Sequence, residues 1–159
     1  TFISLACDVL RRYGVCREVM HPFSTKKLFI PPPVLATREA KLNKIHFHFR
    51  LTSQGQDLID DIILNLKAGN PVIFGTKVGS NWQQYPGGNK VIGITEGDGG
   101  GHAMVIVGYV GGKFIVENSW GTTWGNDGFA WVDPAVFTHS YTRDIWVIVT
   151  GSEAWFEAA

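Results

Sequence analysis

The second half of the chain is a succession of short apolar segments separated by glycine-rich turns. This pattern constrains the fold more than any other feature of the sequence, because runs of this length bounded by turn residues are typical of strands. Gly111-Gly112 lies between two of the segments and is a hairpin signal. The pattern predicts a run of antiparallel strands at residues 71–77, 103–109, 113–117, 129–132 and 144–150.

Two segments of the first half carry apolar residues at helical spacing. Near the N-terminus, Ile3, Cys7 and Leu10 recur at this spacing, Arg11 and Arg12 follow where the helix dipole favours cations, and Gly14 ends the helix. Residues 56–68 form the second predicted helix, which ends before Gly69 and Pro71. Its apolar stripe consists of Leu58, Ile59, Ile62, Ile63 and Leu66.

Residues 45–51 alternate strictly between apolar and polar side chains, which predicts a half-buried strand. The face expected to be buried carries Ile45, Phe47, Phe49 and Leu51, and the face expected to be solvated carries His46, His48 and Arg50. These two histidines have the residue type to bind a metal together with His21 or His139, but a solvated strand face is the simpler interpretation. We therefore expect no metal site.

The order of helix, strand, helix and then several strands is an α+β pattern, without internal repeats. With 159 residues, 45% of them apolar, the chain is long enough to bury the core of one globular domain. Pro31-Pro32-Pro33 is interpreted as an extended surface connection inside that domain. The segments on either side of it are each too small to form a core alone.

Composition excludes several classes of function. The 14 basic and 14 acidic residues balance, so no broad field attracts nucleic acid or an acidic membrane surface. The longest apolar runs, at 103–110 and 145–149, fall short of the roughly 18 residues of a membrane-spanning helix. Two cysteines make neither a disulfide scaffold nor a four-cysteine zinc site. The glycines at 97–101 lack the lysine of a phosphate-binding loop, and we expect no cofactor.

His102 is the first candidate for catalysis, because it follows a glycine run and begins the most apolar strand. Gly100 and Gly101 carry no side chains that would keep a substrate backbone away, and the strand fixes the imidazole on a rigid element. Sixteen residues later, the chain continues with Asn118-Ser119-Trp120-Gly121. An asparagine amide oxygen can accept a hydrogen bond from a histidine ring nitrogen and so orient the ring without adding charge.

These blocks resemble the papain-like cysteine peptidases in order and spacing. The similarity is specific over residues 99–132 and weaker in the segments at 13–16, 21–23 and 71–74. The residues that carry the specific part are His102-Ala103, Val107-Gly108-Tyr109, Asn118-Ser119-Trp120-Gly121, Trp124-Gly125 and Gly128-Phe129. The resemblance implies one papain-like domain over residues 1–159, with residues 1–30 a remnant of its helical half and 31–159 its antiparallel β-rich half.

The resemblance also implies residue roles. His102 and Asn118 would be catalytic, Trp120 would cover the asparagine and exclude water, and Trp124 would pack structurally. Ala103 matches the small residue that helps to floor the substrate pocket, and Gly100 and Gly101 shape the site beside it. The implied substrate is a peptide or a protein.

The nucleophile of such an enzyme is not found at the expected place. The thiol belongs at a helix N-terminus, with the histidine about 130 to 150 residues downstream, which points to a position about 30 residues before Thr1. Cys7 precedes His102 by only 95 residues and lies in the middle of a helix. Cys16 follows the helix end without a new helix behind it. The chain begins at Thr1 rather than methionine, which indicates processing, truncation or an absent segment.

Two hypotheses follow. The first is a thiol peptidase whose cysteine lies upstream or on a separate N-terminal chain. The second is a catalytically inactive relative that serves as a binding or structural component of a larger assembly. An acyltransferase on the same fold is a third possibility, which only product analysis separates from hydrolysis.

Overall fold

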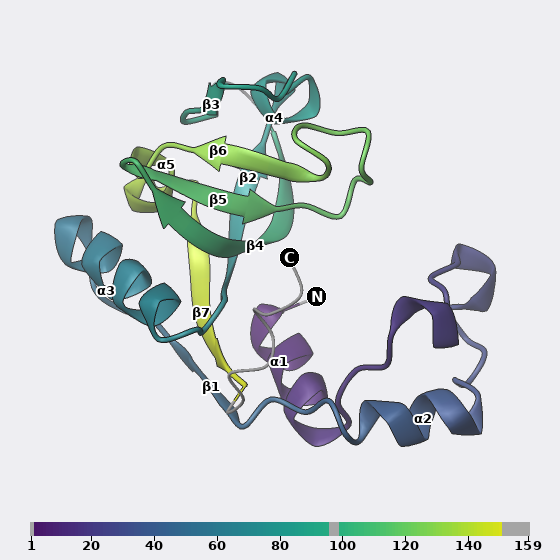
Figure 1. Cartoon of the computed structure of the whole chain (residues 1–159). Helices are drawn as coiled ribbons and strands as arrows, with labels where there is room; N and C mark the ends of the chain where they lie inside the picture. Colours follow the sequence, from purple (N-terminus) through teal and green to yellow (C-terminus); the bar gives the residue numbers. More distant parts are fainter. Residues whose placement is uncertain (1, 96–98, 151–159) are drawn as a thin grey trace.

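The computed structural model describes residues 2–95 and 99–150. A seven-stranded sheet in the order β1-β7-β2-β4-β5-β6-β3 dominates this part of the chain (Figure 1). Its strands are β1 (Phe47–Arg50), β2 (Val72–Val78), β3 (Val91–Ile92), β4 (Gly100–Val110), β5 (Lys113–Glu117), β6 (Phe129–Val132) and β7 (Arg143–Val149). All neighbouring strands pair antiparallel except the short β3, which runs parallel to β6 and was not expected from the sequence. The α+β prediction is confirmed.

The helices pack on the sheet or extend from it. They are α1 (Ile3–Arg12), α2 (Val34–Ala40), α3 (Gly55–Lys67), α4 (Ser80–Gln83) and α5 (Ala135–Thr138), with 3-10 turns η1 (Glu18–Met20) and η2 (Thr25–Lys27). The two helices predicted from apolar spacing, α1 and α3, are confirmed to within two residues of their expected bounds. The shorter α2, α4 and α5 were not predicted, because one or two turns carry too few apolar positions to show a period.

The main core lies between α3, α5 and the sheet. Phe74 on β2, Phe114 on β5 and Phe137 on α5 are fully or almost fully buried and meet edge to face, at centroid distances of 5.0 and 4.8 Å. The buried face of α3 consists of Leu58, Ile59 and Ile62, as the apolar stripe predicted. A smaller cluster on the other side of the sheet packs Cys7 of α1 against Ile45 and Ile148.

The prediction for the faces of the strand at 45–51 is confirmed for Ile45, which is 9% exposed, but is wrong in the middle of the strand. Phe47 and Phe49 are 53% and 38% exposed, whereas the side chain of His48 is only 12% exposed. The reason is that α1 packs on the face that carries His48. There the imidazole lies 5.4 Å from the ring of Trp146, and its Nε2 atom is 3.8 Å from a carboxylate oxygen of Asp8 on α1.

Residues 13–43, which we call the arm, extend to one side of the sheet and contain η1, η2 and α2 (Figure 1). Pro31-Pro32-Pro33 is exposed and lies between η2 and α2, as expected of an extended connection. Gly14 ends α1 with a φ of +78° and fixes the base of the arm, since the next amide, Val15 N–H, donates to the Asn43 carbonyl at 3.1 Å. The arm includes several exposed large apolar side chains: Val15, Val19, Phe23, Leu28, Phe29, Ile30, Val34, Leu35 and Leu42.

Candidate active site

The structure brings His102 and Asn118 into direct contact, although 16 residues separate them. His102 lies near the start of β4, and Asn118 directly follows β5, the antiparallel neighbour of β4. The His102 Nε2 and Asn118 Oδ1 atoms are 2.8 Å apart. Because an amide oxygen can only accept, Nε2 carries the proton in this bond and Nδ1 is left as the nitrogen that can exchange a proton.

Asn118 is itself firmly held. It is 9% exposed, its backbone N–H donates to the Gly128 carbonyl at 3.0 Å, and its Oδ1 also accepts from the Ser119 N–H at 2.8 Å. Gly128 closes the loop between β5 and β6 with a φ of +94°, a conformation that glycine adopts without strain. The loop therefore fixes the amide oxygen before any substrate arrives.

A series of aromatic rings connects the imidazole to the core. The Trp120 indole stacks on the His102 ring with a centroid distance of 5.0 Å and an interplanar angle of 20°. Trp120 meets Trp124 edge to face at 5.5 Å, and Trp124 Nε1 donates to the carbonyl of the buried Trp82 at 2.8 Å. Trp120 thus covers the imidazole and lies on a buried support, which limits the access of water to the bond between His102 and Asn118.

The predicted small residues lie on the other side of the imidazole. Gly101 and Ala103 line a cavity of about 630 Å³ together with His102. They pair across the strands with Lys77 and Gly75 of β2 respectively. Gly100 also lies at the start of β4, paired with Val78, but does not line the cavity. The further lining residues, which sequence reasoning missed, are Ile3, Gly75, Thr76, Lys77, Ser140, Tyr141, Arg143 and Asp144. They come from α1, β2, the segment leading into β7 and the start of β7, so no local motif joins them.

Neither cysteine lines this cavity. Cys7 is fully buried on α1, and desolvation together with the neighbouring Asp8 raises the pKa of its thiol above its ordinary value. Cys16 lies on the arm and is partly exposed. A nucleophilic thiol needs a lowered pKa and access to the imidazole. Cys7 has neither property.

This environment predicts how the two thiols differ in reactivity. We expect iodoacetamide at pH 8 to modify Cys7 of the folded protein at least about tenfold more slowly than Cys16, because the thiolate is the reactive species and burial suppresses it. Peptide mass mapping after short exposures measures both rates, and denatured protein is the control in which the difference disappears. Equal modification rates of the two cysteines in the folded protein would contradict the prediction.

The raised pKa of Cys7 also implies a pH dependence of stability. Since the folded state binds the Cys7 proton more tightly than the unfolded state, the contribution of this group to the free energy of unfolding is present below about pH 9 and is lost as the pH rises further.

Two further properties bear on the kind of site. Within residues 2–95 and 99–150, no group of three or more histidine, cysteine, aspartate or glutamate side chains is arranged to hold a metal ion. In the same part of the chain, no helix has the length and apolar character needed to cross a bilayer.

Comparisons with known proteins agree with the resemblance noted in the sequence. The profile of the papain family cysteine proteases matches residues 2–142. A peptidase C1-like protein of Acanthamoeba polyphaga mimivirus is 31% identical over 157 residues, which cover 92% of this chain and 50% of the viral protein. A cysteine protease of Blomia tropicalis is 27% identical over 127 residues, covering 77% of this chain and 36% of that protein. The chain thus spans half or less of the length of these curated relatives.

A solved structure extends the similarity to three dimensions. Xylellain, a cysteine protease from Xylella fastidiosa, superposes with a TM-score of 0.68 at 27% identity, over 94% of this chain and 62% of xylellain. The family match includes the segment that holds His102 and Asn118. The chain therefore belongs to the papain family of cysteine proteases, and its α+β architecture is the papain-like fold.

Proposed function

We propose that the chain supplies the histidine and asparagine part of the active site of a thiol-dependent peptidase. The observation that carries the proposal is the 2.8 Å contact between His102 Nε2 and Asn118 Oδ1 beneath the Trp120 ring. An imidazole oriented by a neutral amide and shielded from water is suited to form an ion pair with a thiolate through its other nitrogen.

In the proposed reaction, a cysteine thiolate attacks the carbonyl carbon of a peptide bond while His102 is protonated. The imidazolium gives its Nδ1 proton to the leaving amine as the C–N bond breaks, and an acyl-thioester remains. His102 then removes a proton from water, which attacks the thioester carbonyl; the C–S bond breaks, the carboxylic acid product is released, and the thiolate and imidazolium pair is restored. Asn118 keeps the ring in one orientation through both steps, and Ala103 and Gly101 leave room for the substrate beside it.

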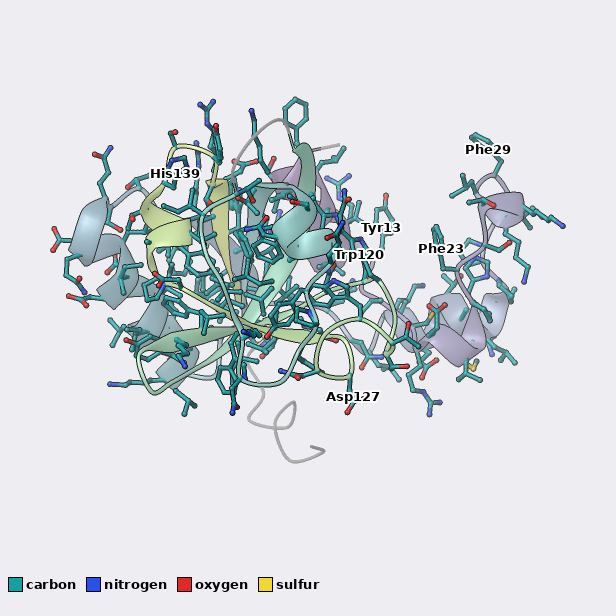
Figure 2. The ribbon with its side chains drawn as sticks, turned by 90° about the horizontal axis from the view of Figure 1, so that it is seen from above. Tyr13, Phe23, Phe29, Trp120, Asp127 and His139 are labelled. Atoms are coloured by element: carbon teal, nitrogen blue, oxygen red, sulfur yellow. The ribbon has the colours of Figure 1, made fainter. Side chains whose placement is uncertain are left out.

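We infer that the nucleophile comes from a segment N-terminal to Thr1 or from a separate chain. This chain covers only 36% to 62% of the length of the relatives. Neither Cys7 nor Cys16 lines the cavity beside His102, as a nucleophile would have to. Apolar side chains on α1 and the arm are also exposed, among them Phe2, Leu5, Tyr13 and Phe23. Figure 2 shows Tyr13, at the base of the arm, close to Trp120 in this view, and Phe23 and Phe29 farther out on the arm. Such a surface is suited to pack against a further apolar helix.

A second candidate function is a binding or structural component that retains the fold without catalysis. The observation in its favour is that no described cysteine lines the cavity beside His102. The residues preceding Thr1 discriminate between the two. A glutamine followed within several residues by a cysteine at a helix start supports the peptidase, whereas serine or glycine at that position supports the inactive relative.

The direct test is covalent labelling of the full-length protein with a peptidyl epoxide directed at thiols. We expect stoichiometric labelling of one cysteine that is neither Cys7 nor Cys16, identified by peptide mass mapping. The Cys16→Ala variant is expected to label like the wild type, and His102→Ala is expected to label much more slowly. Absence of labelling, or labelling at a rate that His102→Ala leaves unchanged, would reject the peptidase hypothesis.

A further inference from the structure

The cavity beside His102 has a floor of small residues and a wall of charged ones. Gly75 faces Ala103 across β2 and β4, and Gly101 faces Lys77. A Cβ atom at Gly101 would meet nothing within 4 Å, so the space in front of this strand is open. A side chain that extends from a peptide bound at His102 has room to enter here.

Three charged side chains line the cavity, and their surroundings differ. The negative charge of Asp144 is already balanced by Arg50, whose Nε lies 3.6 Å from the Asp144 Oδ1. The same oxygen accepts a hydrogen bond from Trp146 Nε1 at 3.2 Å. Lys77 and Arg143, by contrast, have no carboxylate within 4.0 Å among the described residues.

Each of the two cations makes one contact that positions it, although Arg143 is exposed. Lys77 Nζ lies 4.6 Å from the centre of the Tyr141 ring, which fixes the ammonium by a cation–π contact. Arg143 Nε donates to the Ser140 carbonyl at 3.1 Å, so one of its five N–H groups is used and the terminal amino groups remain as donors. Two positioned cations beside a balanced carboxylate leave the cavity with an excess of positive charge.

We propose that this cavity selects peptide substrates that carry an acidic side chain near the scissile bond, with Lys77 and Arg143 as the specificity-determining residues. The inference rests on the proposed function, because it places the substrate backbone at His102. A carboxylate in the cavity would pair with both cations, and the apolar surfaces of Ile3 and Tyr141 would lower the local dielectric and strengthen the attraction. A lysine or arginine side chain would instead meet two like charges.

The experiment measures cleavage by the full-length protein of four peptides that differ in a single residue, which is glutamate, glutamine, leucine or lysine. The varied residue is placed in turn at each of the two positions on either side of the scissile bond. We expect kcat/KM for the glutamate peptide to exceed that for the glutamine peptide by about tenfold at one position, with the lysine peptide lowest, and we expect the ratio to shrink as salt is added. The ratio is the quantity measured, since it does not depend on the amount of active protein.

Substitutions assign the preference to the two cations. Lys77→Met and Arg143→Met are each expected to reduce the ratio of glutamate to glutamine, and the double variant is expected to bring it near one. Lys113→Met is the matched control, because Lys113 pairs with Val110 at the opposite end of β4 and should leave the ratio unchanged. A ratio near one in the wild type, or a ratio unaffected by the double substitution, would overturn the proposal.

Failure of this inference is distinguishable from failure of the proposed function. Epoxide labelling reports the nucleophile and the imidazole whatever the substrate preference. If the protein neither labels nor cleaves, titration calorimetry with the same four peptides tests the cavity directly. Binding of the glutamate peptide about tenfold more tightly than the glutamine peptide, lost in the double variant, would support the acidic preference, and equal binding would refute it.

Discussion

The His102→Ala variant of the full-length protein is expected to lose at least about a thousandfold in kcat/KM for peptide hydrolysis. Both proposed proton transfers pass through this imidazole, and its Nε2–H is already committed to Asn118. The measurement is steady-state kinetics with a fluorogenic peptide, and the protein concentration is corrected for thiol content. A loss below about tenfold would mean that His102 is not the general base.

Variants at Asn118 provide the internal comparison. Asn118→Ala removes the acceptor for Nε2–H but leaves the imidazole in place, so we expect a smaller loss than for His102→Ala, on the order of a hundredfold. The expected signature is a decrease in kcat with little change in KM, because the amide orients a catalytic group without touching substrate. Equal thermal unfolding midpoints for the wild type and His102→Ala would confirm that the kinetic loss does not arise from unfolding.

The largest structural effect is expected from Gly14→Ala, which should destabilise the base of the arm by roughly 3 to 5 kcal/mol. Gly14 has a φ of +78°, and a Cβ atom there would overlap the Ala40 carbonyl oxygen and lie 2.8 Å from the Asn43 carbonyl oxygen. The backbone of α2 would have to move, which breaks the bond from Val15 N–H to Asn43. Hydrogen exchange at the Val15 amide measures the loss.

Gly88→Ala is the matched control for this prediction. Gly88 has a similar φ of +64°, but a Cβ atom there would meet nothing within 4 Å. We expect a loss of about 1 kcal/mol from backbone strain alone. Similar losses at Gly14 and Gly88 would show that close approach of the arm contributes nothing and would contradict the packing described here.

Helices and strands whose apolar residues recur at a regular spacing could be predicted from the sequence, because that spacing places the apolar side chains on one buried side of the element. The apolar stripe of α3 is buried where expected, and β5 and β6 have the predicted bounds. The strand at 45–51 shows where this reasoning stops. Its alternation is correct, but the side that is covered depends on α1, which packs from 35 or more residues away in sequence against His48. Local polarity cannot report which face a distant helix will cover.

The candidate site divides in the same way. The resemblance of the motifs around His102, Asn118 and Trp120 to the papain family predicted their association. The structure brings them together because β4 and β5 form a hairpin and a glycine-closed loop follows it. Of the cavity beside them, Gly101 and Ala103 were expected from the family resemblance, but the charged lining was not predictable, since Lys77 and Arg143 come from segments that no motif links.

By itself, therefore, the sequence determined the α+β class, the family and the histidine and asparagine pair. These depend on local periodicity and on short motifs whose residues are joined by neighbouring strands. Only the tertiary structure decided that Cys7 is a buried thiol with a raised pKa, that Gly14 is required by the approach of α2, and that two cations face the cavity beside His102. Each of these properties depends on which segments, distant in sequence, are in contact. Burial, close approach and unbalanced charge exist only once the chain has packed.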